Sequence, residues 1–254
     1  MQNPRWTYFL KVLPFLLGVG VLLLYTPPRD FAYQYLDLNC RQGYTLYQRI
    51  YTDTTPIDVA FLGSSQTMCG VSDVLLDSLL QADVRKPLQV VNLGQCRYGR
   101  SLHVHLVREL ITHRSPKLIV LEVRVDESRF GHVDFGRVAN ARELIGDPIW
   151  VNHNYFKQIG TGLETRFFAL RHDWLGYPDL TEPTPYTGSQ RFPLDDEILT
   201  LRPVDQDYKV FPLQKIPEEG WAGFIYQINT RYARAQIEEI ARLCKEAGVS
   251  LAFN

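Results

Sequence analysis

Three short apolar segments, each rich in β-branched or other large apolar residues, constrain the fold of this chain more than any other feature. They cover residues 57–62, 88–93 and 117–123, and helix-like stretches at residues 71–80 and 100–112 separate them. Buried strands of a parallel sheet have this length and composition. The alternation of strands and helices therefore predicts an α/β fold with a doubly wound, mostly parallel sheet and right-handed crossovers.

The first of these segments ends in the turn Gly63-Ser64-Ser65, and a helix is predicted just after it. Such a junction presents a serine above the carboxyl edge of a sheet, where the N–H groups of the helix N-terminus face a developing negative charge. A simpler interpretation fits the same residues, with Gly63 forming a tight turn and Ser64 or Ser65 capping the helix. These residues alone leave both interpretations open.

The N-terminus indicates a membrane anchor. Residues 6–25 are apolar except for Lys11, and their number is about that needed to cross the hydrocarbon core of a bilayer. Pro27 and Pro28 end the helix, and no small-residue cleavage site of the signal-peptide type follows. Arg5 before the span and Arg29 after it give a slight bias toward a cytoplasmic N-terminus, which would place the rest of the chain outside the cytoplasm.

Composition excludes several classes of function. The 254 residues carry 27 basic and 28 acidic side chains without a basic block, which argues against a nucleic-acid partner. The four cysteines are scattered without the spacing of a zinc site, and we expect neither a metal nor another cofactor. Their even number permits disulfides, but the sequence does not pair them.

The chain divides into an anchor at residues 1–28, a tether at 29–55 and an α/β domain at 56–254. Within that domain, residues 128–226 show weak periodicity and many aromatic residues, which predicts a cap over the carboxyl edge of the sheet. A last helix at residues 230–247 precedes Gly248 and a strand at 249–253.

With its three strand ends, the chain resembles the SGNH/GDSL-type hydrolases. It is most similar to their membrane-anchored extracytoplasmic branch, which includes the DltD-like and the alginate O-acetylation (AlgJ/AlgX-like) proteins. The resemblance covers residues 57–127 and 230–254, and it implies an SGNH/flavodoxin-like three-layer sandwich. It also implies Ser65 as the nucleophile, Ser64 at the variable middle position, and Gly99, or alternatively Gly94, as a backbone donor to the oxyanion.

The chain departs from the family pattern at two places. Asp126 stands where the family has an asparagine that donates to the oxyanion, and a carboxylate donates only when it is protonated. The family's late Asp-x-x-His block is expected after the last strand, but the sequence ends at Asn254, as in a truncated product or a relic. The six histidines are expected to be packing, helix-end or loop residues: His103, His105, His113, His132, His153 and His172.

The resemblance implies an esterase or acyltransferase that acts through Ser65 on acyl esters of cell-envelope glycans or polymers. Its implied partners are the membrane, an envelope polysaccharide and a membrane-bound acyltransferase. Little activity is expected without the catalytic histidine. Two alternatives compete: a non-catalytic SGNH-fold module for binding or assembly, and an ordinary α/β domain whose helix is capped at this turn.

Overall fold

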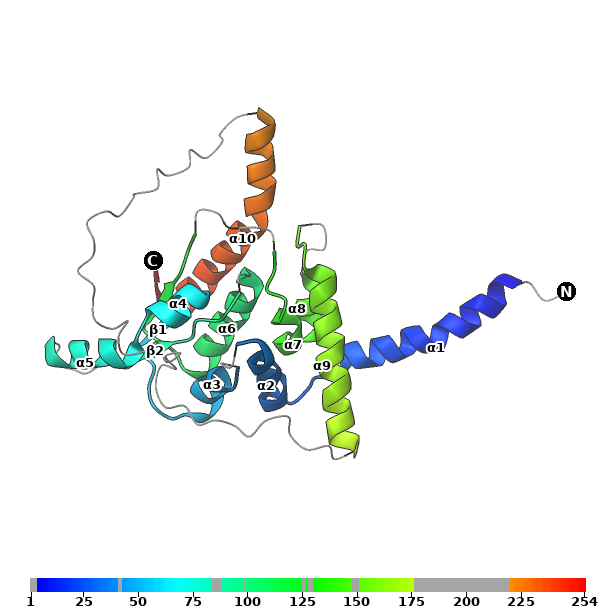
Figure 1. The fold of residues 1–254 in the computed structure, drawn as a ribbon, viewed down its shortest axis with the longest axis horizontal. Helices are drawn as coiled ribbons and strands as arrows, with labels where there is room; N and C mark the ends of the chain where they lie inside the picture. Colours follow the sequence, from blue (N-terminus) through cyan, green and yellow to red (C-terminus); the bar gives the residue numbers. More distant parts are fainter. Residues whose placement is uncertain are drawn as a thin grey trace.

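A computed structural model gives the architecture shown in Figure 1. It describes residues 4–40, 43–83, 88–97, 99–124, 127, 130–147, 151–175 and 220–254. The helix α1 (Pro4–Leu24) extends away from an α/β body formed by the other described elements.

The body is organised around four described strands that all run parallel. They are β1 (Val59–Leu62), β2 (Val90–Asn92), β3 (Leu118–Leu121) and β4 (Ser250–Phe253). Their order in the sheet is β2-β1-β3-β4, and Ala60 in β1 pairs with Val91 on one side and Ile119 on the other. The predicted parallel α/β fold is therefore confirmed. The chain first moves outward from β1 to β2 and then crosses back to β3, so the direction of winding reverses between β1 and β3.

Helices connect successive strands. The short α4 (Ser65–Gly70) and α5 (Asp73–Asp83) lie between β1 and β2, α6 (Arg100–His113) between β2 and β3, and α10 (Gly220–Ala247) between β3 and β4. Right-handed crossovers in this strand order put α6 and α10 on one face of the sheet, where the two helices contact each other, and α4 and α5 on the other. Three fully buried leucines at helical spacing fix α6 against the core: Leu102, Leu106 and Leu110.

The segment predicted as a tether is part of this core. It folds into α2 (Arg29–Cys40), α3 (Gly43–Tyr47) and the π-helical η1 (Gln48–Thr52). Four of its apolar side chains lie in the same buried cluster as the strands: Tyr33, Leu36, Leu46 and Ile50. The segment that follows α1 is therefore packed into the body.

Part of the predicted cap region is helical, although its weak periodicity predicted no clear elements. It contains α7 (Phe135–Val138), α8 (Ala141–Gly146) and the long α9 (Tyr155–Leu175). A capping box starts α8, with Asn140 accepting from the Glu143 N–H and Glu143 accepting from the Asn140 N–H. The other part of the predicted cap, residues 176–219, lies outside the described residues.

The segment predicted as an anchor forms the helix α1. Apart from Lys11, most of its described side chains are apolar and exposed, for example Phe15 at 70% and Val21 at 64%. Among the residues that the structure describes, no single helix is long and apolar enough to cross a bilayer. The segment Leu10–Leu24 meets that condition only together with Arg29–Leu36, across a bend of 97°.

Candidate active site

The turn after β1 lies where an open α/β sheet forms its ligand crevice, outside the carboxyl ends of the two strands at which the winding reverses. Gly63 is required in this turn, since a Cβ atom there would lie 2.7 Å from Cβ of Glu122. Glu122 follows β3, the neighbouring strand. The turn after β1 and the end of β3 are therefore in direct contact.

Glu122 holds the first turn of α4 in place. Its carboxylate accepts hydrogen bonds from the Ser64 N–H and hydroxyl, each at 2.8 Å, and from the Thr67 hydroxyl at 2.6 Å and N–H at 3.3 Å. All three residues are buried. Burial alone would raise the pKa of Glu122, but these hydrogen bonds outweigh it and lower the pKa below 4.5. The ionised carboxylate therefore connects the end of β3 to the turn after β1.

Ser64 is the N-cap of α4, because its hydroxyl accepts the Gln66 N–H at 3.2 Å while it donates to Glu122. The capping interpretation thus holds for Ser64. Ser65, the next residue, is exposed at the first position of the helix. Within the described part of the chain, neither its hydroxyl nor its N–H has a hydrogen-bond partner, so both are free to meet a ligand.

The other end of α4 is fixed by Asn92, the last residue of β2. Its side-chain amide donates to the carbonyl oxygens of Thr67, Met68 and Val71 at 3.0, 3.2 and 2.7 Å. The Thr67 carbonyl also accepts the Val71 N–H at 3.1 Å, whereas helix C-termini usually leave their last carbonyl groups without intrahelical partners. Asn92 therefore adds contacts to the carbonyl groups at the C-terminal end of α4. The position of Ser65 is therefore set by polar contacts at both ends of the helix.

The two candidate oxyanion glycines are both buried, and Gly94 lies against α4. The Gly94 N–H donates to Asn92 Oδ1 at 2.9 Å, and a Cβ atom on Gly94 would lie 2.8 Å from Cα of Met68 in α4. Gly99 precedes α6 with φ at +146°, a conformation that favours glycine, and its Cα faces the backbone of His132. In this conformation the Gly94 N–H is already used. Asp126 lies outside the described residues.

A second buried layer supports the turn from the side of α6. The Nε2–H of His103 donates to the Gly63 carbonyl at 3.1 Å, so its Nδ1 accepts from Arg100 Nη1 at 3.2 Å. Arg100 in turn forms a bidentate ion pair with Glu127, and its Nε lies 2.9 Å from Glu127 Oε2. Arg100, His103 and Glu127 are all buried.

The histidines of this region are engaged in structural contacts. His132 accepts the Asp134 N–H on Nδ1 at 3.2 Å and donates from Nε2 to the Cys96 carbonyl at 3.0 Å. His153 contacts the Phe130 ring, and His172 the Phe31 ring. No histidine nitrogen in the described part of the chain forms a hydrogen bond with Ser65. The described residues also contain no group of three or more His, Cys, Asp or Glu side chains that could hold a metal ion.

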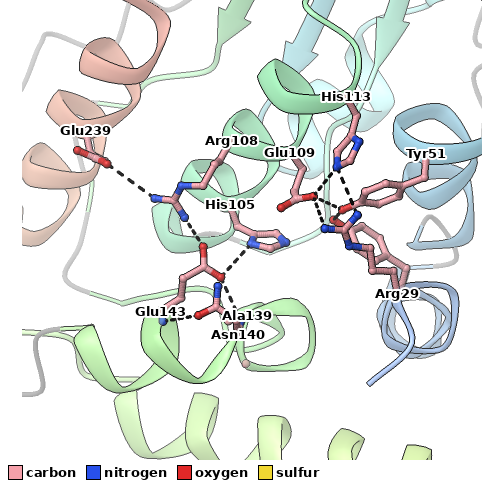
Figure 2. Close-up of polar contacts among 12 residues, drawn as sticks. Arg29, Tyr51, His105, Arg108, Glu109, His113, Ala139, Asn140, Glu143 and Glu239 are labelled. Atoms are coloured by element: carbon pink, nitrogen blue, oxygen red, sulfur yellow. Dashed lines mark hydrogen bonds and ion pairs between the residues drawn. The ribbon is translucent and has the colours of Figure 1, made fainter. Parts of the chain in front are cut away.

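A polar cavity of about 540 Å³ lies away from this turn, between α6, α8 and α10. Figure 2 shows that its charged side chains pair with one another: Glu143 contacts Arg108 and lies 3.4 Å from His105 Nδ1, while Arg108 Nη2 lies 3.7 Å from Glu239 Oε1. Burial alone would raise the pKa of Glu143, but the neighbouring His105, the Asn140 N–H and Arg108 together lower it. The cluster connects three helices and offers no free nucleophile.

The stability of the fold should depend on the neutral form of His103. Burial, with the charge of Arg100, lowers its pKa from 6.5 to about 3. Between about pH 3 and 6.5, His103 therefore binds a proton in the unfolded chain but not in the folded one. Its contribution to the free energy of unfolding is complete above pH 6.5 and decreases as the pH falls. Down to about pH 5 this loss amounts to about 2 kcal/mol. His103→Gln, which keeps a donor for Gly63, should remove this part of the slope when unfolding is followed by urea titration at several pH values. An unchanged slope would contradict the account.

Sequence reasoning missed most of the residues that build the site, although a signal existed. Asn92 and Glu122 are polar residues that close otherwise apolar strands, and such residues lie at the carboxyl edge of a parallel sheet. Thr67, Arg100 and Glu127 carry no comparable signal. Comparisons of the chain with protein-family models, with curated proteins and with solved structures find no match.

Proposed function

We propose that the chain is a membrane-anchored, extracytoplasmic serine esterase or acyltransferase of the SGNH type that acts on acyl esters of cell-envelope glycans. One observation carries this proposal. Ser65 has an exposed, unpartnered hydroxyl at the point where the winding of a parallel sheet reverses, on a helix held at both ends by buried polar contacts.

In this proposal Ser65 Oγ attacks the carbonyl carbon of the ester. The hydroxyl proton passes to a base as the Oγ–C bond forms, and the Ser65 N–H donates to the oxyanion. The bond from this carbon to the alcohol oxygen then breaks, and the alcohol leaves with a proton. Water or a glycan hydroxyl attacks the acyl-serine in the second half of the reaction and restores the Ser65 hydroxyl.

The base is the component that the described residues do not supply. His103 and His132 lie near the turn, but each has both ring nitrogens engaged in hydrogen bonds. Without a base, a serine hydroxyl is a weak nucleophile. This favours, as a second candidate, a non-catalytic module that keeps the fold to bind an envelope polysaccharide or an acyltransferase partner.

Two observations support the proposed location. Apart from Lys11, the exposed side chains of α1 are predominantly apolar, which suits a lipid environment. Cys96 is disulfide-bonded, and disulfides persist in oxidising compartments such as the periplasm or the cell surface.

The ester-cleavage proposal predicts that an external base restores activity. We expect the full chain in mild detergent to cleave an activated acetyl ester slowly, and added imidazole to accelerate release of the alcohol above the rate in buffer with imidazole alone. Ser65→Ala should abolish the acceleration. Ser78→Ala, which removes an exposed helical hydroxyl on α5, should retain it. Equal acceleration in the wild-type chain and Ser65→Ala would favour the non-catalytic module.

A further inference from the structure

In the long helix α9, polar residues face the body and large apolar residues face outward, which is the reverse of an ordinary surface helix. The face that packs against the body carries small and polar residues, and all five are buried: Gln158, Gly162, Thr165, Arg166 and Ala169. The opposite face exposes Phe156 at 75%, Phe167 at 51% and Trp174 at 80%. A helix on the surface of a soluble domain normally shows the opposite arrangement.

These exposed aromatic residues form one continuous stripe. Phe156, Phe167 and Trp174 are separated by eleven and seven residues, which brings them to the same side of a helix. Leu163 and Leu170 fill the intervening turns and are half-buried. The stripe therefore runs over almost the whole length of α9.

The C-terminal end of α9 lies at the point where α1 meets the body. Tyr25 donates a hydrogen bond to Asp173 Oδ2 at 2.5 Å, one residue before Trp174. Figure 1 shows α1 leaving the body beside α9, and α9 running across the direction of α1 along that edge of the molecule. A bilayer spanned by α1 would therefore lie along α9, on the side away from the body.

Contacts with the body fix this arrangement. On the inner side of α9, Ala169 and Phe168 pack with Phe31 and Tyr35 of α2. Arg29, at the start of α2, contacts two residues of α6 (Figure 2). Its Nη2 lies 3.7 Å from Glu109 Oε2, and its Nη1 lies 3.3 Å from His113 Nε2. The end of α1 and the helix α9 are thus both held to the same rigid core.

Charged residues border the stripe in a way that suits lipid headgroups. The exposed Lys157 lies on one flank, where a basic side chain can reach anionic headgroups while its aliphatic part stays in the interface. Glu164, the acidic residue on that flank, is paired with Arg137 Nη1 at 3.0 Å. Exposed tryptophan is typical of the membrane–water interface.

We propose that α9 is an interfacial helix that lies on the membrane next to α1, with the stripe from Phe156 to Trp174 in the headgroup region. This inference rests on the part of the proposed function that makes α1 a membrane anchor. Two contact points fix the orientation of the body, and they set the height of the sheet's carboxyl edge above the bilayer. The lipid surface is the occupant of the stripe.

The test measures the surroundings of Trp174 directly. The full chain is placed in nanodiscs of phosphatidylcholine and phosphatidylglycerol, with and without lipids brominated near the headgroup, and its tryptophan fluorescence is recorded. The difference between the wild-type chain and Trp174→Phe gives the emission of Trp174. The difference between the wild-type chain and Trp6→Phe gives the emission of Trp6, which reports whether the predicted span lies in the membrane. We expect brominated lipid to quench both components and aqueous iodide to spare Trp174.

Other results would separate the two claims. If lipid quenches Trp6 while iodide quenches Trp174, the anchor stands but α9 faces water and the inference is overturned. If neither quencher reaches Trp174, protein covers the stripe, as in contact with a second copy, and the inference fails again. If lipid does not quench Trp6, the anchor itself is refuted and the inference falls with it.

Discussion

Replacing Glu127 by alanine is expected to lower the free energy of unfolding by about 3–5 kcal/mol, because it leaves the buried guanidinium of Arg100 without its carboxylate. The contact of Arg100 with Nδ1 of the neutral His103 carries no negative charge that could replace the carboxylate. Urea titration of the full chain in mild detergent, followed by circular dichroism, measures the change.

A double variant separates the ion pair from its surroundings. Arg100→Met with Glu127→Leu removes both charges and roughly keeps the buried volume, so it should recover most of the lost stability. If the double variant is as unstable as Glu127→Ala, the cost comes from packing or from the other contacts of these residues. The buried charge would then not be the cause.

Glu122→Ala should cost about 3 kcal/mol, since it removes the acceptor of two hydroxyl and two N–H donors in a buried position. The substitution also leaves a space between β1 and β3. Glu122→Gln keeps the shape and two acceptor lone pairs, and its cost should be about half as large.

An exposed glutamate provides the matched control for this second prediction. Glu246 on α10 pairs with Arg242 at the surface, and Glu246→Ala should change the free energy of unfolding by less than about 0.5 kcal/mol. A change for Glu122→Ala as small as that of Glu246→Ala would show that the network does not hold the turn.

The strands and the connecting helices could be predicted from the sequence, because buried parallel strands and amphipathic helices impose clear periodicities. Residues 100–112, for example, place Leu102, Leu106 and Leu110 on one face, and the structure has α6 there. The helix predicted at residues 71–80 corresponds to α5, whereas the short α4 was not predicted, since six residues are too few to show a helical period.

The helix α9 was missed for a physical reason. Its fully buried face is built largely from Gln158, Gly162 and Thr165, so the usual continuous stripe of large apolar residues toward the core is missing from α9. Its aromatic residues instead lie on the outer face, and in the sequence they are typical of a loop-rich cap. A pattern search for core-facing residues cannot recognise a helix whose apolar side is turned away from the core.

The site could be located from the sequence but not built. The Gly63-Ser64-Ser65 turn marks its position, whereas its rigidity depends on Glu122 and Asn92, which are brought in by the pairing of β1 with both neighbouring strands. Ser64 and Glu122 are 58 positions apart in the sequence, and Thr67 and Asn92 are 25 positions apart. These contacts follow from the order of the strands in the sheet, which a single sequence does not specify.

The most direct measurement of the central claim is the position at which a fluorophosphonate probe attaches to the full chain. With imidazole present, peptide mass spectrometry should find the adduct on Ser65, and Ser65→Ala should lose it while Ser78→Ala keeps it. If Ser65 stays unmodified, or is modified no faster than Ser78, then Ser65 does not act as a nucleophile and the esterase proposal is wrong.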